Sequence, residues 1–322
     1  MLGSKANALC LLEILKKHSD DTHILTMEDL QNRMRSEYGI ELERKAVYAN
    51  LNLLSDFGYD ISMYADNKKG YCLCSREFEP SEVHLLADAV YSSSFIPEKA
   101  TLDLIKKLQA TQSKHFSSRI KSMTFIRPDV KTANKELFYN IEILDDAVSQ
   151  GVKVTFDYLR YDINKRLVAR RDTKYIVSPY AVVWANEKYY LICYYEKYNS
   201  ISHFRIDKIK NITLLEEKAV PAENGFSPYN YAKSAIYMYG NKAERIEIVC
   251  DMDILDDVID RFGKDIHIES CGKNQFKAVI YAALGGIKFW ALQYLQHCEI
   301  TYPQSLRAEV AQIIKAGMDK YY

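Results

Sequence analysis

The sequence predicts a multidomain protein of the α+β class, and three observations support this. The first 76 residues read as three helices followed by a β-hairpin. Residues 136–220 read as one helix and then four or five short strands with turn signals between them, which is typical of a small, strongly bent sheet or barrel. Residues 241–322 read as strand, helix, strand, strand and helix. With 322 residues, the chain is long enough for two or three domains.

The composition is that of a folded globular protein. Hydrophobic residues make up 48% of the chain and charged residues 27%, whereas a disordered chain would have few hydrophobic residues and a high net charge. The 43 basic and 43 acidic residues give a formal net charge of zero. This balance excludes binding to nucleic acid through overall positive charge, but it is compatible with a local basic patch.

The seven cysteines lack the paired CxxC spacing of a zinc site, and most of them lie in apolar runs. We expect free thiols in a reducing cytosol, with no metal and no cofactor. Residues 1–21 read as an amphipathic helix rather than a signal peptide. The longest late apolar run, 276–295, is interrupted by two lysines and a Gly-Gly pair. These features predict a soluble cytoplasmic protein without a membrane segment.

Helical spacing and end signals define the first two helices of an N-terminal domain over residues 1–76. Leucines repeat at helical spacing in residues 9–15. The second helix begins with Thr26 three residues before Asp29, a variant of the capping box, and Gly39 marks its end.

A third helix and a hairpin complete the layout of a winged helix-turn-helix. The third helix, in "ERKAVYANLNLLSDFGYD" (43–60), has one apolar stripe, and "DISMYADNKKGYCLC" (60–74) reads as two strands around the turn 66–70. In this layout the third helix enters the major groove of DNA. The residues that we expect at DNA are Arg44, Lys45, Tyr48, Asn52, Lys68 and Lys69. The domain carries ten basic and eleven acidic residues, so a helical protein-interaction domain remains the alternative.

The third helix also resembles the recognition helix of DeoR-like winged-helix regulators. Residues kept from that pattern are Arg44, Lys45, Val47, Tyr48, Leu51 and Gly58. The family often has Arg-Asp after the Tyr, whereas this chain has Ala49 and Asn50. One expected contact is therefore missing, and the operator preference of the family does not carry over.

The strands of 136–220 contrast a doubly apolar strand with a one-sided one. Candidate strands are 152–160, 173–185, 187–195 and 201–209, with a fifth at 212–217, after a helix that Gly151 ends. Residues 189–195 offer no polar face, which predicts a central strand covered on both sides. On the next strand we expect Phe204 and Ile206 in the core, with His203, Arg205 and Asp207 on the opposite face.

This constellation resembles the WYL domain, which is named for a Trp-Tyr-Leu triplet on its central strand and usually follows a DeoR-like winged helix. The matching pieces are "VTFDY" (154–158), "VSPYAVVW" (177–184), Tyr189-Tyr190-Leu191 and "HFRIDKI" (203–209). Tyr189 replaces the Trp, and Tyr175 stands where many members have an Arg. The resemblance implies an SH3/Sm-like small β-barrel that senses a nucleotide or nucleic-acid fragment through basic residues on these strands.

The side-chain chemistry fits an anionic, planar ligand. Arg offers a planar fork to phosphate, and Tyr and His add donors and stacking surfaces for a base. The predicted ligand-binding residues are Tyr158, Arg170, Arg171, Ser178, Tyr180, His203 and Arg205, with Arg170 or Arg171 replacing the family Arg at Tyr175. The alternatives are that His203 is a surface histidine, that Arg205 pairs with Asp207, that the tyrosines of 189–195 belong to the core, and that 163–172 is a solvated loop.

Three segments surround this predicted WYL domain. Residues 77–135 read as a helical connector, with Pro80 as a start and a break at Ile96-Pro97. Residues 221–240 read as a linker. The βαββα pattern of residues 241–322 is ferredoxin-like, with a closing helix from 305, and such an extension in WYL regulators implies a homodimer.

The function that we infer from the sequence is a ligand-responsive DNA-binding transcriptional regulator. Its expected partners are a double-stranded DNA operator, a nucleotide or single-stranded nucleic-acid ligand and a second copy of the chain. One alternative is an accessory protein of a nucleic-acid-processing system. The other is an enzyme acting on nucleotides, which we do not expect because the sequence has no phosphate-binding Gly loop, metal-ligand spacing or nucleophile elbow.

Overall fold

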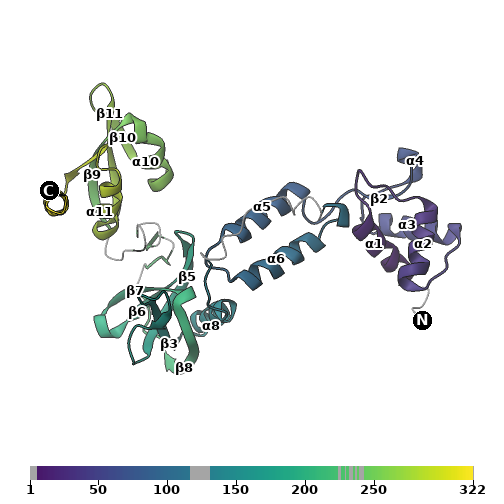
Figure 1. Ribbon diagram of the computed structural model, residues 1–322, viewed down its shortest axis with the longest axis horizontal. Coiled ribbons are helices and arrows are strands. Elements are labelled where there is room, and N and C mark those ends of the chain that lie inside the picture. The colour runs from purple at the N-terminus through teal and green to yellow at the C-terminus, as the bar shows by residue number, and fades with distance from the viewer. Residues whose placement is uncertain are drawn as a thin grey trace. The chain divides into compact units, whose positions relative to one another are not determined.

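The computed structural model describes residues 6–116, 131–223, 226–228, 230, 231, 235, 238 and 243–321. The chain divides into two compact units, residues 1–133 and 134–322 (Figure 1). Helices dominate the first unit and antiparallel sheets the second, which confirms the predicted α+β class. Within the described ranges, no helix combines the length and the hydrophobicity needed to cross a bilayer.

Three helices build the core of the first unit: α1 (Asn7–His18), α2 (Met27–Tyr38) and α3 (Arg44–Asp56). Their buried stripes meet in one hydrophobic cluster that includes Leu11, Leu30 and Leu51. The capping box at the start of α2 is present, because the Thr26 hydroxyl accepts from the Asp29 amide and the Asp29 carboxylate accepts from the Thr26 amide. The predicted helix end at Gly39 is confirmed, with the glycine in the left-handed conformation.

The predicted hairpin forms from β1 (Ile61–Ser62) and β2 (Cys72–Leu73), but its connection is longer than expected. A short helix, α4 (Tyr64–Asn67), occupies part of the segment between the strands. Leu25 pairs with Tyr71 and so attaches the segment before α2 to the hairpin. Gly70, which precedes Tyr71, must be a glycine, because a Cβ atom at that position would lie 2.1 Å from the Leu25 carbonyl oxygen.

The connector consists of α5 (Pro80–Ser92) and α6 (Glu98–Ala110), which lie side by side (Figure 1). Pro80 starts α5 and Pro97 caps α6, as the sequence predicts. Residues 117–130, which the sequence also assigns to the connector, lie outside the described residues.

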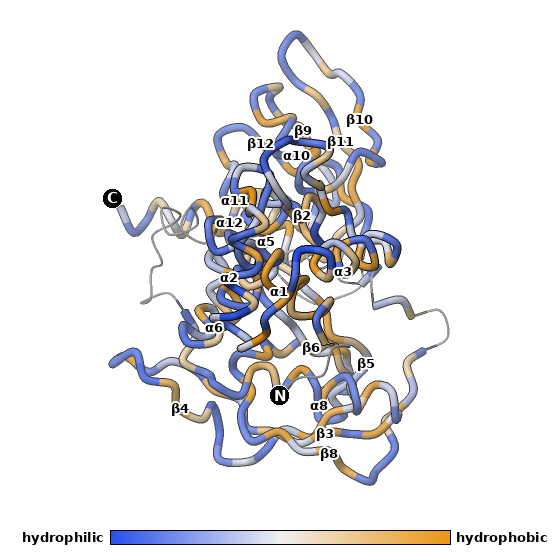
Figure 2. The backbone as a smooth tube through the Cα atoms, turned by 90° about the vertical axis from the view of Figure 1, so that its right-hand side faces the viewer, coloured by the Kyte–Doolittle hydropathy of each residue, from blue (hydrophilic) through white to orange (hydrophobic). Residues whose placement is uncertain are grey.

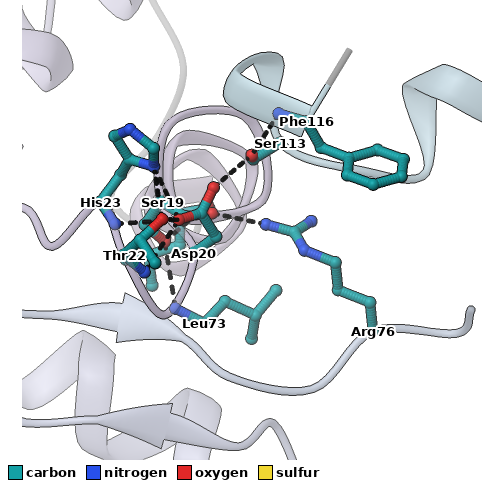
Figure 3. Close-up of polar contacts among 9 residues, drawn as sticks. Ser19, Asp20, Thr22, His23, Leu73, Arg76, Ser113 and Phe116 are labelled. Carbon is teal, nitrogen blue, oxygen red and sulfur yellow. Dashed lines mark hydrogen bonds and ion pairs between the residues drawn. The ribbon is translucent and has the colours of Figure 1, made fainter. Parts of the chain in front are cut away.

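Polar contacts join the connector to the helical bundle (Figure 3). Arg76 donates from an Nη to the Ser19 carbonyl at 2.6 Å, and the Ser113 hydroxyl donates to an Asp20 carboxylate oxygen at 2.6 Å. Burial alone would raise the pKa of Asp20, but hydrogen bonds from Ser113, His23 and Thr22 outweigh it and hold that pKa well below its usual range. The junction is therefore a polar one that keeps Asp20 ionised.

The second unit begins with α8 (Leu137–Gln150), which Gly151 ends, and continues as a six-stranded antiparallel sheet. The strands are β3 (Val152–Tyr161), β4 (Leu167–Ala169), β5 (Tyr175–Ala185), β6 (Lys188–Tyr195), β7 (Ser200–Arg205) and β8 (Ile209–Lys218). The sheet order is β4-β3-β5-β6-β7, and β8 also pairs with β3. Residues 163–172 are mostly exposed, as the interpretation as a solvated loop predicts, but residues 167–169 form the short strand β4 (Figure 2).

Strand β6 is covered on both sides, as its apolar composition predicts. Leu191 and Cys193 are fully buried on the face that carries Tyr195, which meets an aromatic cluster. Ile192 is fully buried on the opposite face, where Ala235 and Met238 of the predicted linker pack against it. Other residues of the predicted linker, including 232–234 and 239–240, lie outside the described residues.

The C-terminal part forms a separate four-stranded antiparallel sheet in the order β10-β11-β9-β12. Its elements are β9 (Ala243–Asp251), α10 (Leu255–Phe262), β10 (His267–Ser270), β11 (Gln275–Ala283), α11 (Leu284–Gln293), β12 (Cys298–Tyr302) and α12 (Gln304–Met318). Strand β12 was not predicted; it forms by pairing with β9, so that Cys298 lies opposite Cys250.

Candidate ligand-binding site

Arg205 is the last residue of β7, and its guanidinium is held by a carboxylate. Its Nε and one Nη donate to the two carboxylate oxygens of Asp207 at 3.0 and 2.6 Å. The Arg205 side chain is 30% exposed, whereas Asp207 is 6% exposed. The alternative that Arg205 pairs with Asp207 is thus confirmed. Asp207 is not on the polar strand face as predicted, because the strand ends at Arg205 and a 3-10 turn, η4 (Ile206–Lys208), turns it inward.

Three further cations surround this ion pair. Lys188 begins β6, on the face that carries Tyr190, and Tyr190 pairs with Arg205 across the strands. Burial lowers the pKa of Lys188, and the positive charge of Arg205 lowers it further. Burial likewise lowers the pKa of Lys208, with additional repulsion from Arg205 and Arg170. Asp207 opposes the repulsion in both cases, and Glu187 also opposes it at Lys188, so four cations lie near two carboxylates.

Sequence reasoning missed Lys188 and Lys208, although two signals were available. Lys188 stands two residues before Tyr190, which puts both on one face of the strand that pairs with the Arg205 strand. The second signal is that Lys208 lies only three residues after Arg205 in the sequence. The 3-10 turn of residues 206–208 brings it near Arg205.

Tyr158 lies beneath Arg205 rather than in an open pocket. Its hydroxyl accepts a hydrogen bond from the Arg205 backbone amide at 3.2 Å, and burial raises its pKa. Its ring packs edge-on against Phe204 and Tyr175, with centroids 5.0 and 5.9 Å away. Tyr158 therefore fixes the backbone position of Arg205.

The two candidate loop arginines occupy different environments. Arg171 donates to the carbonyls of Thr173 and Lys174 and to the Tyr195 hydroxyl, and its Cζ lies 3.5 Å from the centre of the Tyr175 ring. Arg171 therefore covers the ring of Tyr175, the position at which the sequence comparison led us to expect an Arg. Arg170 is exposed after β4 and contributes to the positive potential at Lys208. Arg170 thus belongs to the Arg205 cluster, whereas Arg171 serves the aromatic core.

Two other predicted residues contact Val220 and Pro221, at the start of the segment 220–238. Ser178 is buried, and its hydroxyl accepts from the Val220 amide at 2.9 Å. The Tyr180 hydroxyl donates to the Pro221 carbonyl at 3.3 Å. These contacts give both side chains an anchoring role on the face of the sheet that the segment covers.

His203 lies under the same segment, so its interpretation as a surface histidine was wrong. Its ring lies 5.1 Å from that of Tyr231, and its Nε2 is buried without a hydrogen-bond partner in the described part of the chain. Burial lowers the pKa of His203 to about 4, against an opposing hydrogen bond with the Met238 backbone. The ring is therefore neutral near pH 7.

The residues predicted to contact DNA all lie in the first unit. Arg44, Lys45 and Asn52 are exposed on α3, and Lys68 and Lys69 are exposed after α4. Tyr48 is half-buried, with its ring edge-on to Tyr71 of the hairpin at 5.8 Å. Tyr48 thereby ties α3 to the hairpin.

Two further properties concern metals and thiols. No group of three or more His, Cys, Asp or Glu side chains suited to a metal ion occurs among the described residues. All seven cysteines are free thiols.

Comparison with known proteins identifies the region around Arg205. The family model of the WYL domain matches residues 139–214, so the chain contains a WYL domain that spans α8 to β8 and the whole Arg205 cluster. The resemblance drawn from the strand motifs is thereby confirmed for this region.

Among the solved structures that match, two align over almost the full length of this chain. One is proteasome accessory factor B/C (PafBC) of Arthrobacter aurescens, at 14% identity and a TM-score of 0.29, with 98% of this chain and 49% of that chain covered. This chain thus spans about half the length of PafBC. The other is described as a CRISPR Cas-related protein, at 13% identity and a TM-score of 0.39, with 100% of this chain and 88% of that chain covered. No curated protein matches the chain.

Proposed function

We propose that the chain is a ligand-responsive DNA-binding transcriptional regulator whose WYL domain binds an anionic nucleotide or single-stranded nucleic-acid ligand at the Arg205 cluster. The observation that carries this proposal is the grouping of Lys188, Arg205 and Lys208 near one buried carboxylate, that of Asp207, with Arg170 close enough to Lys208 to repel it. Cations held near one another repel, and a bound phosphate would relieve that repulsion.

The cluster combines the parts that recognise a nucleotide. Asp207 fixes the Arg205 guanidinium in one orientation, so little side-chain entropy is lost when a phosphate binds. Tyr190, opposite Arg205, offers an aromatic surface to a base. We assign these residues a binding role rather than a catalytic one, because Asp207 is occupied by Arg205 and the His203 ring is buried under the 220–238 segment.

The first unit supports a DNA-binding role of the winged-helix type. Three helices precede a hairpin, and the pairing of Leu25 with Tyr71 adds a third segment to it, as a winged helix-turn-helix requires. Basic and amide side chains of α3 are exposed to meet base edges and phosphates. A DeoR-like winged helix therefore remains our assignment.

The C-terminal sheet supports the ferredoxin-like assignment. Its order β10-β11-β9-β12, with every neighbour antiparallel, is that of a βαββαβ unit. We propose that this part joins two chains in a homodimer, so that the operator has two half-sites.

The test removes two charges of the cluster and leaves the Arg205–Asp207 pair intact. In Lys188→Gln/Lys208→Gln, we expect nucleotide affinity to fall about tenfold or more, because two charge-assisted contacts are lost. The matched control, Lys165→Gln/Lys197→Gln, removes two exposed lysines elsewhere in the same domain. Titration calorimetry measures the affinity, and a mobility-shift assay on the chain's own upstream DNA measures the response.

Three outcomes distinguish the functions. Salt-sensitive DNA binding that nucleotide alters in the wild type and the control, but not in the cluster variant, supports the regulator. Equal nucleotide affinity in the two variants contradicts the site. DNA binding that is absent at every salt concentration contradicts the regulator and favours an accessory role in a nucleic-acid-processing system.

A further inference from the structure

The first unit contains a groove of about 860 Å³ between the helical bundle and the connector. The groove is lined by Lys16 and Lys17 of α1, by Lys106 of α6 and by Lys114. Arg76 also lines it. Tyr59, which follows α3, also lines the groove. The volume is in the range of small-molecule sites, about 300–1,000 Å³.

The charge of the groove is strongly positive although the whole chain is neutral. Five cations and two carboxylates, those of Glu13 and Glu77, line it, so its formal charge is +3. Glu13 pairs with Lys16 at 3.6 Å, and Lys17 pairs with Glu37, which does not line the groove, at 3.0 Å. Lys106 and Lys114 form no ion pair within the ranges that the structure describes, and both are exposed. The groove therefore holds cations that are available to an anion.

Arg76 adds an observation of a different kind. Its guanidinium is partly buried and donates to the Ser19 carbonyl at 2.6 Å (Figure 3). It also donates to the Thr111 carbonyl at 3.5 Å. Burial lowers the pKa of Arg76, an effect that Asp20 and Asp21 oppose. No carboxylate of the described residues forms an ion pair with Arg76, because Asp20 is directed to Ser113, Thr22 and His23. Asp20 and Asp21 favour the charged form of Arg76 without forming an ion pair with it, so an anion in the groove would gain a direct contact with its guanidinium.

We propose that this groove is a second ligand site, which binds the phosphates of a nucleoside polyphosphate on Lys106, Lys114 and Arg76. The exposed Tyr59 ring offers the base a stacking surface. The site lies in the first unit and uses none of the residues of the Arg205 cluster. It therefore does not depend on the function proposed for that cluster.

The experiment must locate binding, because nucleotide is also expected at the Arg205 cluster. Amide hydrogen exchange of the full chain, titrated with ATP, reports protection separately for the peptides of α1 and α6. The groove variant is Lys106→Glu/Lys114→Glu. The matched control is Lys99→Glu/Lys107→Glu, which makes the same charge change on exposed lysines of α6 outside the groove.

We expect ATP to protect α1 and α6 in the wild type and the control, with the midpoint concentration raised about tenfold or more in the groove variant. Equal midpoints in the two variants, or absence of protection in the wild type, would overturn the proposal. Two further probes distinguish the sources of phosphate. Inorganic triphosphate that protects as well as ATP would overturn the role of Tyr59. A duplex oligonucleotide that protects the same peptides better than ATP would overturn the small-ligand assignment in favour of a DNA backbone.

Discussion

Protonation of His203 should destabilise the second unit as the pH falls below neutrality. The folded chain holds the pKa of this residue at about 4, whereas the ordinary value is 6.5. Below pH 6.5 the unfolded chain takes up a proton that the folded chain does not, so stability is lost as the pH falls. The loss begins near pH 6.5 and is complete below about pH 4. Its full extent is about 3 kcal/mol, and about 2 kcal/mol of it falls between pH 7.5 and 5.

This loss of stability arises because Tyr231 and Met238 lie against His203 of β7. The imidazole packs against Tyr231 and hydrogen-bonds the Met238 backbone, but its Nε2 is buried without a partner in the described residues, so a charged ring would be poorly solvated. The substitution His203→Gln removes the titrating group. The control His267→Gln removes a histidine of the same unit whose side chain is 69% exposed.

Urea unfolding at several pH values between 7.5 and 5, followed by tryptophan fluorescence, measures the effect. Both tryptophans, Trp184 and Trp290, lie in the second unit, so the signal reports on that unit alone. The wild type and the control should lose about 2 kcal/mol more than His203→Gln over this range. Contributions from other groups cancel because all three chains share them. Parallel pH profiles for the wild type and His203→Gln would refute the burial argument.

Two substitutions test close approaches in the fold. Gly70→Ala should destabilise the first unit by about 3 kcal/mol, because the new Cβ would collide with the Leu25 carbonyl; thermal unfolding followed by circular dichroism measures this, and Gly317→Ala, which meets no atom within 4 Å, should show no such loss. Ser178→Ala should destabilise the second unit by about 1 kcal/mol, because the Val220 amide loses its acceptor. An unchanged urea midpoint in tryptophan fluorescence would contradict that role of Ser178.

Much of the site was predictable because strand alternation is a local property. The apolar run 189–195 predicted a strand covered on both faces, and the positions of Arg205 and Phe204 on opposite faces followed from the period of two. We predicted that the alternation continues to Asp207, on the polar face of the strand. The strand ends at Arg205, and the 3-10 turn buries Asp207 and brings Lys208 to the cluster.

The sequence by itself determined the order of most elements, their type and the Arg-containing strand, since periodicity and the Gly, Pro and capping signals act over a few residues. Only the tertiary structure decided which cations meet. Lys188 lies near Arg205 because β6 pairs with β7, and Arg170 lies near Lys208 although it comes from another part of the chain. Arg76 lines one groove with lysines of α1 and α6. The tertiary structure also decided that His203 is buried, because its cover comes from a segment more than twenty residues further along the chain. Burial and charge clustering depend on contacts between distant segments, and such contacts leave no regular spacing in the sequence.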